Sequence, residues 1–113
     1  MKSELGDKIR IPHILDAITE IEDYLKGVDY QLYLENLEKR FATIKQIEII
    51  GKASIALIDE LKEKHSEIPW KLIRGFEIFQ YTNILVLTFV WEIVTSDLPL
   101  LKLQIMEINH GFE

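Results

Sequence analysis

The fold is decided by one stretch, Leu37 to Lys64, which reads LEKRFATIKQIEIIGKASIALIDELKEK and contains no proline. Its apolar residues recur at steps of three and four, the spacing that gathers side chains on one face of an α-helix. This stripe comprises Phe41, Ile44, Ile47, Gly51, Ile55, Ile58 and Leu61, and a second line comprises Ala42, Ile49, Ile50, Ala53 and Leu57. Because the apolar face is wide, we predict one long, central helix with neighbours on two sides.

Two helices are predicted before this stretch. Apolar residues at helical spacing predict a helix over about Ile11 to Lys26, with Pro12 in its first turn and Gly27 as its stop. A second, brief helix is predicted within Asp29 to Glu35.

Two more helices are predicted after it. Pro69 ends the long helix and suits the start of another near Trp70. The spacing of Leu98, Leu101, Ile105 and Ile108 predicts a closing helix, in which Asp97 and Pro99 form a cap or a kink.

The predicted fold class is all-α. We find no strand-and-turn alternation, glycine-rich loop or internal repeat in the sequence, so an antiparallel helical bundle of four to five helices is the simplest architecture. A chain of 113 residues suits one domain, over residues 1–113.

Composition excludes several function classes. With 13 Lys and Arg against 19 Asp and Glu, the net charge is −6, which argues against an overall basic surface for nucleic acid. The absence of cysteine excludes disulfides, a thiolate zinc site and a cysteine nucleophile. Residues 1–10 lack the apolar segment of a signal peptide, and the apolar run Ile84–Val90 is far shorter than the roughly 20 residues of a membrane span. We therefore expect a cytoplasmic protein without membrane contact.

The stretch from Phe76 to Val90 differs from the rest of the chain. It is rich in residues that prefer strands, and its only charge is Glu77. Three interpretations stay open: a fully buried helix, a stray strand or an oligomer interface.

Four segments around that stretch resemble the HepT-like toxins of the HEPN superfamily. They are HILDAITEIEDYL (His13 to Leu25), FATIKQIEIIGKAS (Phe41 to Ser54), HSEIPWKLIRG (His65 to Gly75) and VWEIVTSDLP (Val90 to Pro99). Each is a weak signal alone, and together they are fairly specific. The resemblance implies a dimeric helical bundle with endoribonuclease activity, the toxin of a type VII toxin-antitoxin pair. It also implies a nucleotidyltransferase-fold (MntA-like) antitoxin, which in some pairs adenylylates a tyrosine of the active motif.

The catalytic motif implied by the resemblance is missing. It is Arg, four residues, His, one residue, Tyr, and it is expected to begin at Phe76 or Glu77, just after Gly75. Residues 76–83 read FEIFQYTN, without Arg or His. Gln80 and Thr82 can form hydrogen bonds but cannot replace an imidazole, so we expect little or no RNA cleavage by this sequence.

A frameshift is one hypothesis for this absence. With suitable synonymous codons for Glu77 to Thr88, one base restored before Glu77 gives RNISVHEYFGVD, which contains the complete motif. A second change is then needed to recover the frame before Trp91.

Few other polar residues are candidates for a site. Lys62, Lys64, Lys71 and Arg74 could form a phosphate-steering patch, although cations at solvated helix ends are equally explained by the helix dipole. Glu48 could be a buried acid that holds a catalytic Arg, although a solvent-facing Glu is commoner.

Other side chains favour structural roles. The three histidines, His13, His65 and His110, lack a second His at metal-ligand spacing, so we assign no metal and no cofactor. Tyr24, Tyr30 and Tyr33 could stack on RNA bases, but packing is the commoner role, as it is for Trp70 and Trp91.

Three functions remain open. The first is a toxin ribonuclease that is inactive as written. The second is a non-catalytic helical dimer that binds a nucleotidyltransferase-fold partner, with residues 76–90 genuinely encoded and buried at an interface. The third is an orphan bundle without a partner.

Overall fold

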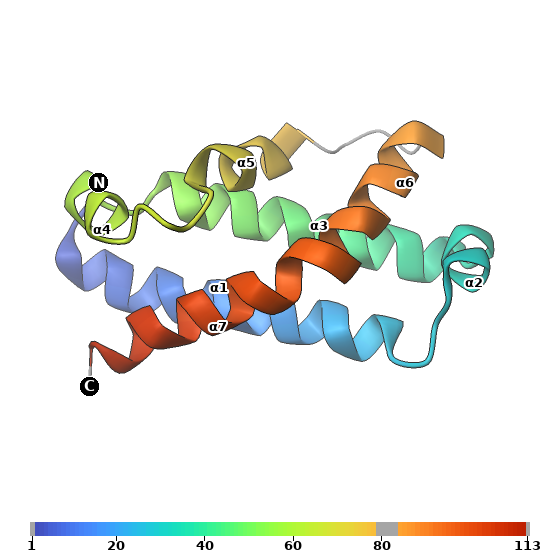
Figure 1. Cartoon of the computed structure of the whole chain (residues 1–113), viewed down its shortest axis with the longest axis horizontal. Helices are drawn as coiled ribbons and strands as arrows, with labels where there is room; N and C mark the ends of the chain where they lie inside the picture. Colours follow the sequence, from blue (N-terminus) through green and yellow to red (C-terminus); the bar gives the residue numbers. More distant parts are fainter. Residues whose placement is uncertain (1, 79–83, 113) are drawn as a thin grey trace.

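The computed structural model describes residues 2–78 and 84–112, and of residues 77 and 78 it describes the backbone. Within these ranges all regular structure is helical and there is no strand, as the sequence predicted. α1 (Glu4–Leu25) and α3 (Leu37–Ile55) run antiparallel along the molecule, and α7 (Leu98–His110) packs against α1 (Figure 1). The described helices outnumber the predicted four to five because several are very short.

α1 begins earlier than predicted, at Glu4 instead of Ile11. The Oγ atom of Ser3 accepts a hydrogen bond from the Gly6 amide at 2.9 Å and so caps the helix. Pro12 therefore lies inside the helix and not in its first turn. The predicted stop is confirmed, because Gly27 adopts a positive φ of 72°, a conformation that only glycine adopts without strain.

α2 (Tyr30–Glu35) confirms the predicted brief helix. The carboxylate of Asp29 accepts from the Leu32 amide at 2.8 Å and caps it. α3 occupies the centre predicted for it, in contact with α1, α2 and α5 (Trp70–Arg74). Its Ile44, Ile47 and Ile50 are buried in the core.

The predicted long helix is wrong in one respect: it breaks at residues 56–58. α3 ends at Ile55, and α4 (Asp59–Lys64) is a separate helix. The Ile58 amide donates to Oδ1 of the buried Asp7 at 3.3 Å, so a side chain of α1 takes the place of an intrahelical acceptor. Leu57 is buried at the break.

The second half of the chain begins at the predicted proline. α5 follows Pro69 and continues into a 3-10 helix, η1 (Gly75–Ile78). α6 (Ile84–Glu92), a π-helical segment η2 (Ile93–Asp97) and α7 then form one continuous helix. Asp97 forms no side-chain cap, so the cap interpretation is wrong. The π turn lies just before Pro99, which has no amide hydrogen for an α-helical bond.

The unusual stretch is described in two parts: Phe76–Ile78 lies in η1 with Phe76 buried, and Ile84–Val90 is helical and neither a strand nor fully buried. Leu87 and Val90 are in the core, whereas Leu85 is 79% exposed and Ile84 is 56% exposed. The strand and the fully buried helix are therefore wrong for Ile84–Val90, and the oligomer interface stays a prediction.

The helix from Ile84 to His110 is 27 residues long and, within residues 2–78 and 84–112, the one long and apolar enough to cross a membrane. Core helices of soluble proteins meet the same criterion, although only 28% of the most apolar window is buried here. The short length of Ile84–Val90 therefore no longer argues against a span, and the absence of membrane contact stays a prediction.

Candidate functional site

The position expected for the catalytic motif lies just beyond α5. Phe76, in η1, has its side chain buried in the core. Residues 79–83, including Gln80 and Thr82, lie outside the described residues, as does the side chain of Glu77. The absence of Arg and His from residues 76–83 is known from the sequence alone. Little or no RNA cleavage therefore stays a prediction.

Three of the four predicted phosphate-steering residues line one hollow. Lys62, Lys71 and Arg74 surround a volume of about 240 Å³ together with Ser54, Ile55 and Trp70, and we call this the cationic hollow. It lies where the end of α3, α4 and α5 meet. Lys64 is not part of it.

Lys64 lines a second hollow of about 410 Å³, which we call the acidic hollow. Its charged lining is Glu4, Asp7, Glu60, Glu107, Lys64 and His65, and its apolar lining includes Ile58, Leu61, Ile108 and Phe112. The cationic hollow contains a guanidinium but no imidazole, and the acidic hollow contains an imidazole but no guanidinium. Neither hollow replaces the missing catalytic pair.

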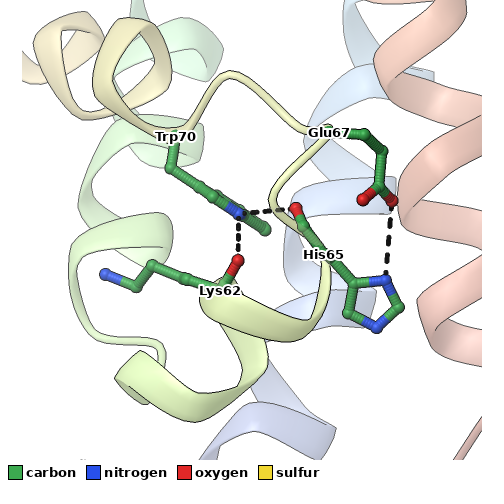
Figure 2. A network of polar contacts seen from close by, with 4 residues as sticks. All are labelled: Lys62, His65, Glu67 and Trp70. Atoms are coloured by element: carbon green, nitrogen blue, oxygen red, sulfur yellow. Dashed lines mark hydrogen bonds and ion pairs between the residues drawn. The ribbon is translucent and has the colours of Figure 1, made fainter.

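The indole of Trp70 fixes the wall between α4 and α5. Its Nε1 donates to the carbonyl oxygens of Lys62 at 3.2 Å and His65 at 3.0 Å, two acceptors at the end of α4 (Figure 2). The Lys62 oxygen lies in the last turn of α4, where carbonyls lack an intrahelical amide, so the indole satisfies it, whereas the His65 oxygen also accepts from the Ile68 amide at 3.1 Å. Figure 2 also shows the Lys62 side chain extending to the side opposite from the contact between Nδ1 of His65 and Oε1 of Glu67, which are 3.7 Å apart.

The charged side chains that line the cationic hollow are all positive within the described part of the chain. Within the described part of the chain, Lys62, Lys71 and Arg74 form no ion pair, and no acidic residue lines this hollow. Burial, followed by repulsion from Lys2, lowers the pKa of Lys62; Arg74 adds to this repulsion, and attraction from Asp59 and Asp7 opposes it. The site is therefore a local positive region on a chain of net charge −6.

Glu48 lies on α3 with its side chain mostly covered, at 16% exposure. Its Oε1 is 3.0 Å from Nζ of Lys52, one helical turn away, and it lines neither hollow. The structure thus gives Glu48 a cationic partner, and its role towards a catalytic Arg stays a prediction.

Asp7 is a buried acid that the sequence did not single out. Its Oδ1 accepts from Ile58, whereas its Oδ2 is buried without a hydrogen-bond partner within the described residues. Burial raises the pKa of Asp7 above its ordinary value of 3.8. The sequence does contain a signal for a buried Asp7. Asp7 lies one helical turn before Ile11, so a predicted helix that started after Ser3 would have placed it on the apolar face.

The remaining candidates have structural surroundings. Tyr33 is buried and donates to the Leu87 carbonyl at 2.9 Å, Tyr30 shares a 2.7 Å hydrogen bond with Thr88, and the rings of Tyr33 and Trp91 lie 5.0 Å apart. Burial raises the pKa of Tyr33 to about 12. His13 lies exposed on α1 and His110 lies at the exposed end of α7, and no group of three metal-ligating side chains occurs in residues 2–78 and 84–112.

Comparisons with known proteins show the family of this chain. The family model described as "Ribonuclease HepT-like" matches residues 14–108. "Probable ribonuclease HepT" of Thermococcus cleftensis is 34% identical over 79% of this chain and 83% of its own length. A "Putative RNase" of Methanocaldococcus jannaschii is 32% identical over 81% of this chain and 86% of its own.

A third relative, also from Methanocaldococcus jannaschii, is named "Gamma-glutamylcyclotransferase and putative RNase" and is 38% identical over 89% of this chain. The chain spans 46% of that protein's length. No solved structure gives a significant match. The family model covers most of the chain and the relatives match over most of it, so this chain belongs to the HepT-like ribonuclease family.

Proposed function

We propose that the protein is a toxin-type endoribonuclease of a type VII toxin-antitoxin pair that cannot cleave RNA as its sequence stands. The observation that carries this proposal is the family match over residues 14–108 together with the absence of Arg and His from residues 76–83. In the family motif, His activates the ribose hydroxyl or protonates the leaving oxygen, and Arg stabilises the charged phosphate. This chain supplies neither group at that position.

A frameshift would account for the loss of both groups at once. With suitable synonymous codons, restoring one base before Glu77 supplies Arg, His and Tyr in the family spacing, and a second change then recovers the frame before Trp91. On a helix, an Arg and a His five residues apart lie about 140° apart, which suits an active site shared between two subunits. The nucleotide sequence between Gly75 and Trp91 tests this origin, because codons without Arg, His and Tyr in the shifted frame would exclude it.

The exposed apolar face of α6 and α7 supports a homodimer. Ile84, Leu85, Leu100, Leu103 and Met106 are all exposed on this continuous helix. Large exposed apolar side chains at the start of α6 and along α7 are of the kind found at protein interfaces. The cysteine-free composition is compatible with a reducing cytoplasm, where RNA and a nucleotidyltransferase-fold antitoxin would be met.

One observation favours the second function, a non-catalytic dimer that binds such an antitoxin. Leu87 and Thr88 lie within the stretch attributed to the frameshift, yet Leu87 is buried and Thr88 forms a hydrogen bond with Tyr30. Specific contacts of this kind are expected of a genuinely encoded segment.

Expression of two forms of the gene separates these functions. The frame-restored form should arrest growth when the antitoxin is absent and should degrade RNA, whereas the unrestored form should do neither. If the restored protein is folded, harmless and leaves RNA intact, the binding function is favoured. An adjacent nucleotidyltransferase gene is expected under both, and its absence would favour an orphan bundle.

A further inference from the structure

The cationic hollow has the composition of a site for a compact anion. Three cations from two short helices face one small volume that contains no carboxylate. Some cations elsewhere in the described chain have acidic partners, as in Lys52 with Glu48 and Lys102 with Glu22, but what sets the hollow apart is that three cations line one small volume. Burial disfavours the charged form of Lys62 and Arg74 repels it, with Asp59 and Asp7 acting in the opposite direction, and an anion bound between Lys62, Lys71 and Arg74 would favour their charged forms.

The lining also supplies groups for more than a simple ion. Arg74 can form paired hydrogen bonds with two oxygens of a phosphate, and the two lysines can contribute point charges. The Trp70 ring and Ile55 add an apolar surface beside these charges, where a nucleotide base can pack. The Trp70 indole N–H is already engaged by two carbonyls, so the wall is held in place before any ligand arrives.

The charge balance indicates which phosphate fits. An internal RNA phosphodiester carries one negative charge, whereas a terminal phosphate monoester carries about 1.5 to 2 near neutrality. Three cations around one volume match the second better than the first.

We propose that the cationic hollow binds the terminal phosphate of a nucleotide, with Lys62, Lys71 and Arg74 as its ligands and Trp70 beside the adjoining base. The shared chemistry is a phosphomonoester, carried either by the 5′ end of an RNA or by a free nucleoside monophosphate. This site does not require the missing catalytic motif, so it is independent of RNA cleavage.

Titration calorimetry on the full-length protein tests the proposal with four probes: 5′-phosphorylated RNA, the same RNA with a 5′-hydroxyl, adenosine monophosphate and adenosine. At least one phosphorylated probe should bind about tenfold more tightly than its unphosphorylated partner, the difference expected from charged hydrogen bonds to one phosphate. A preference confined to RNA assigns the site to an RNA end, and one confined to the mononucleotide assigns it to a free nucleotide.

The variants are Lys71→Gln and Arg74→Gln, both at exposed positions, so folding should be preserved and can be checked by circular dichroism. Each should remove most of the preference for phosphate. The matched control is Lys45→Gln, an exposed lysine on α3 outside the hollow, which should leave it unchanged. Equal binding of phosphorylated and unphosphorylated probes, or an equal loss in the control, would overturn the proposal.

Discussion

The contact of Tyr33 with α6 allows a quantitative test of how the helices assemble. Tyr33 lies on α2, is fully buried, and donates through Oη to the Leu87 carbonyl at 2.9 Å. Replacing Tyr33 with Phe removes this hydrogen bond and keeps the ring against Trp91. Because a carbonyl inside an α-helix keeps its own amide partner, only the net value of one hydrogen bond is lost, about 1 kcal/mol.

For a chain of this size, that loss lowers the melting temperature by about 4 °C. The assay is thermal and urea unfolding followed by circular dichroism, at one fixed protein concentration. Tyr24→Phe is the matched control: the Tyr24 Oη accepts a longer hydrogen bond of 3.3 Å from Gln46 and is only partly buried, so its loss should be smaller.

The same variant has a pH signature. The pKa of Tyr33 is raised from 10 to about 12 in the folded protein, so the folded state holds this proton more tightly than the unfolded chain does. Its contribution to stability is complete below about pH 10 and is lost as the pH rises towards 12. Ultraviolet titration should show one late-ionising phenol that is absent from Tyr33→Phe. A variant as stable as the wild type, with the late phenol still present, would refute the contact between α2 and α6.

Three further predictions concern other parts of the molecule. The pKa of Asp7 is raised by burial, so the unfolding free energy of the wild type should fall relative to Asp7→Asn as the pH rises from about 4 towards neutrality; parallel curves would contradict this. Leu103→Glu should convert the proposed dimer to a monomer in light scattering, whereas Leu5→Glu, at an exposed leucine on α1, should leave its mass unchanged. If instead the wild type requires detergent and Leu103→Glu is soluble without it, the partner of this face is a membrane. Ser3→Ala should cost about 1 kcal/mol in denaturant unfolding by removing the α1 cap, and no loss would argue that the helix starts later.

Local signals in the sequence predicted much of the fold correctly. Gly27, Asp29 and Pro69 act on their own neighbours, so the end of α1 and the starts of α2 and α5 were predictable. The break after Ile55 was not, because it depends on Asp7, a residue 51 positions away whose carboxylate takes the Ile58 amide. The spacing of apolar residues carries no information about a hydrogen bond between segments that are far apart in the sequence.

The candidate site was predicted in part for a similar reason. Lys62, Lys71 and Arg74 meet because α4 and α5 fold together around Trp70, which spacing alone does not show. Lys64 faces the other hollow, and this was predictable: two positions along a helix correspond to about 200° of rotation, so Lys62 and Lys64 point to opposite sides. The uncharged, apolar composition of Phe76–Val90 correctly marked this segment as different from the rest of the chain. Its residues Ile84–Val90 form a helix that leaves Leu85 exposed.

RNA cleavage by two purified proteins, the unrestored chain and its frame-restored counterpart, is the most direct test of the missing catalytic pair, in buffer with a metal chelator. The restored protein should cut RNA, and replacing its motif histidine should abolish the cutting, while the unrestored chain leaves the same RNA intact. Sustained cleavage by the unrestored chain, at a rate comparable to the restored protein, would show that its activity does not depend on the missing Arg and His.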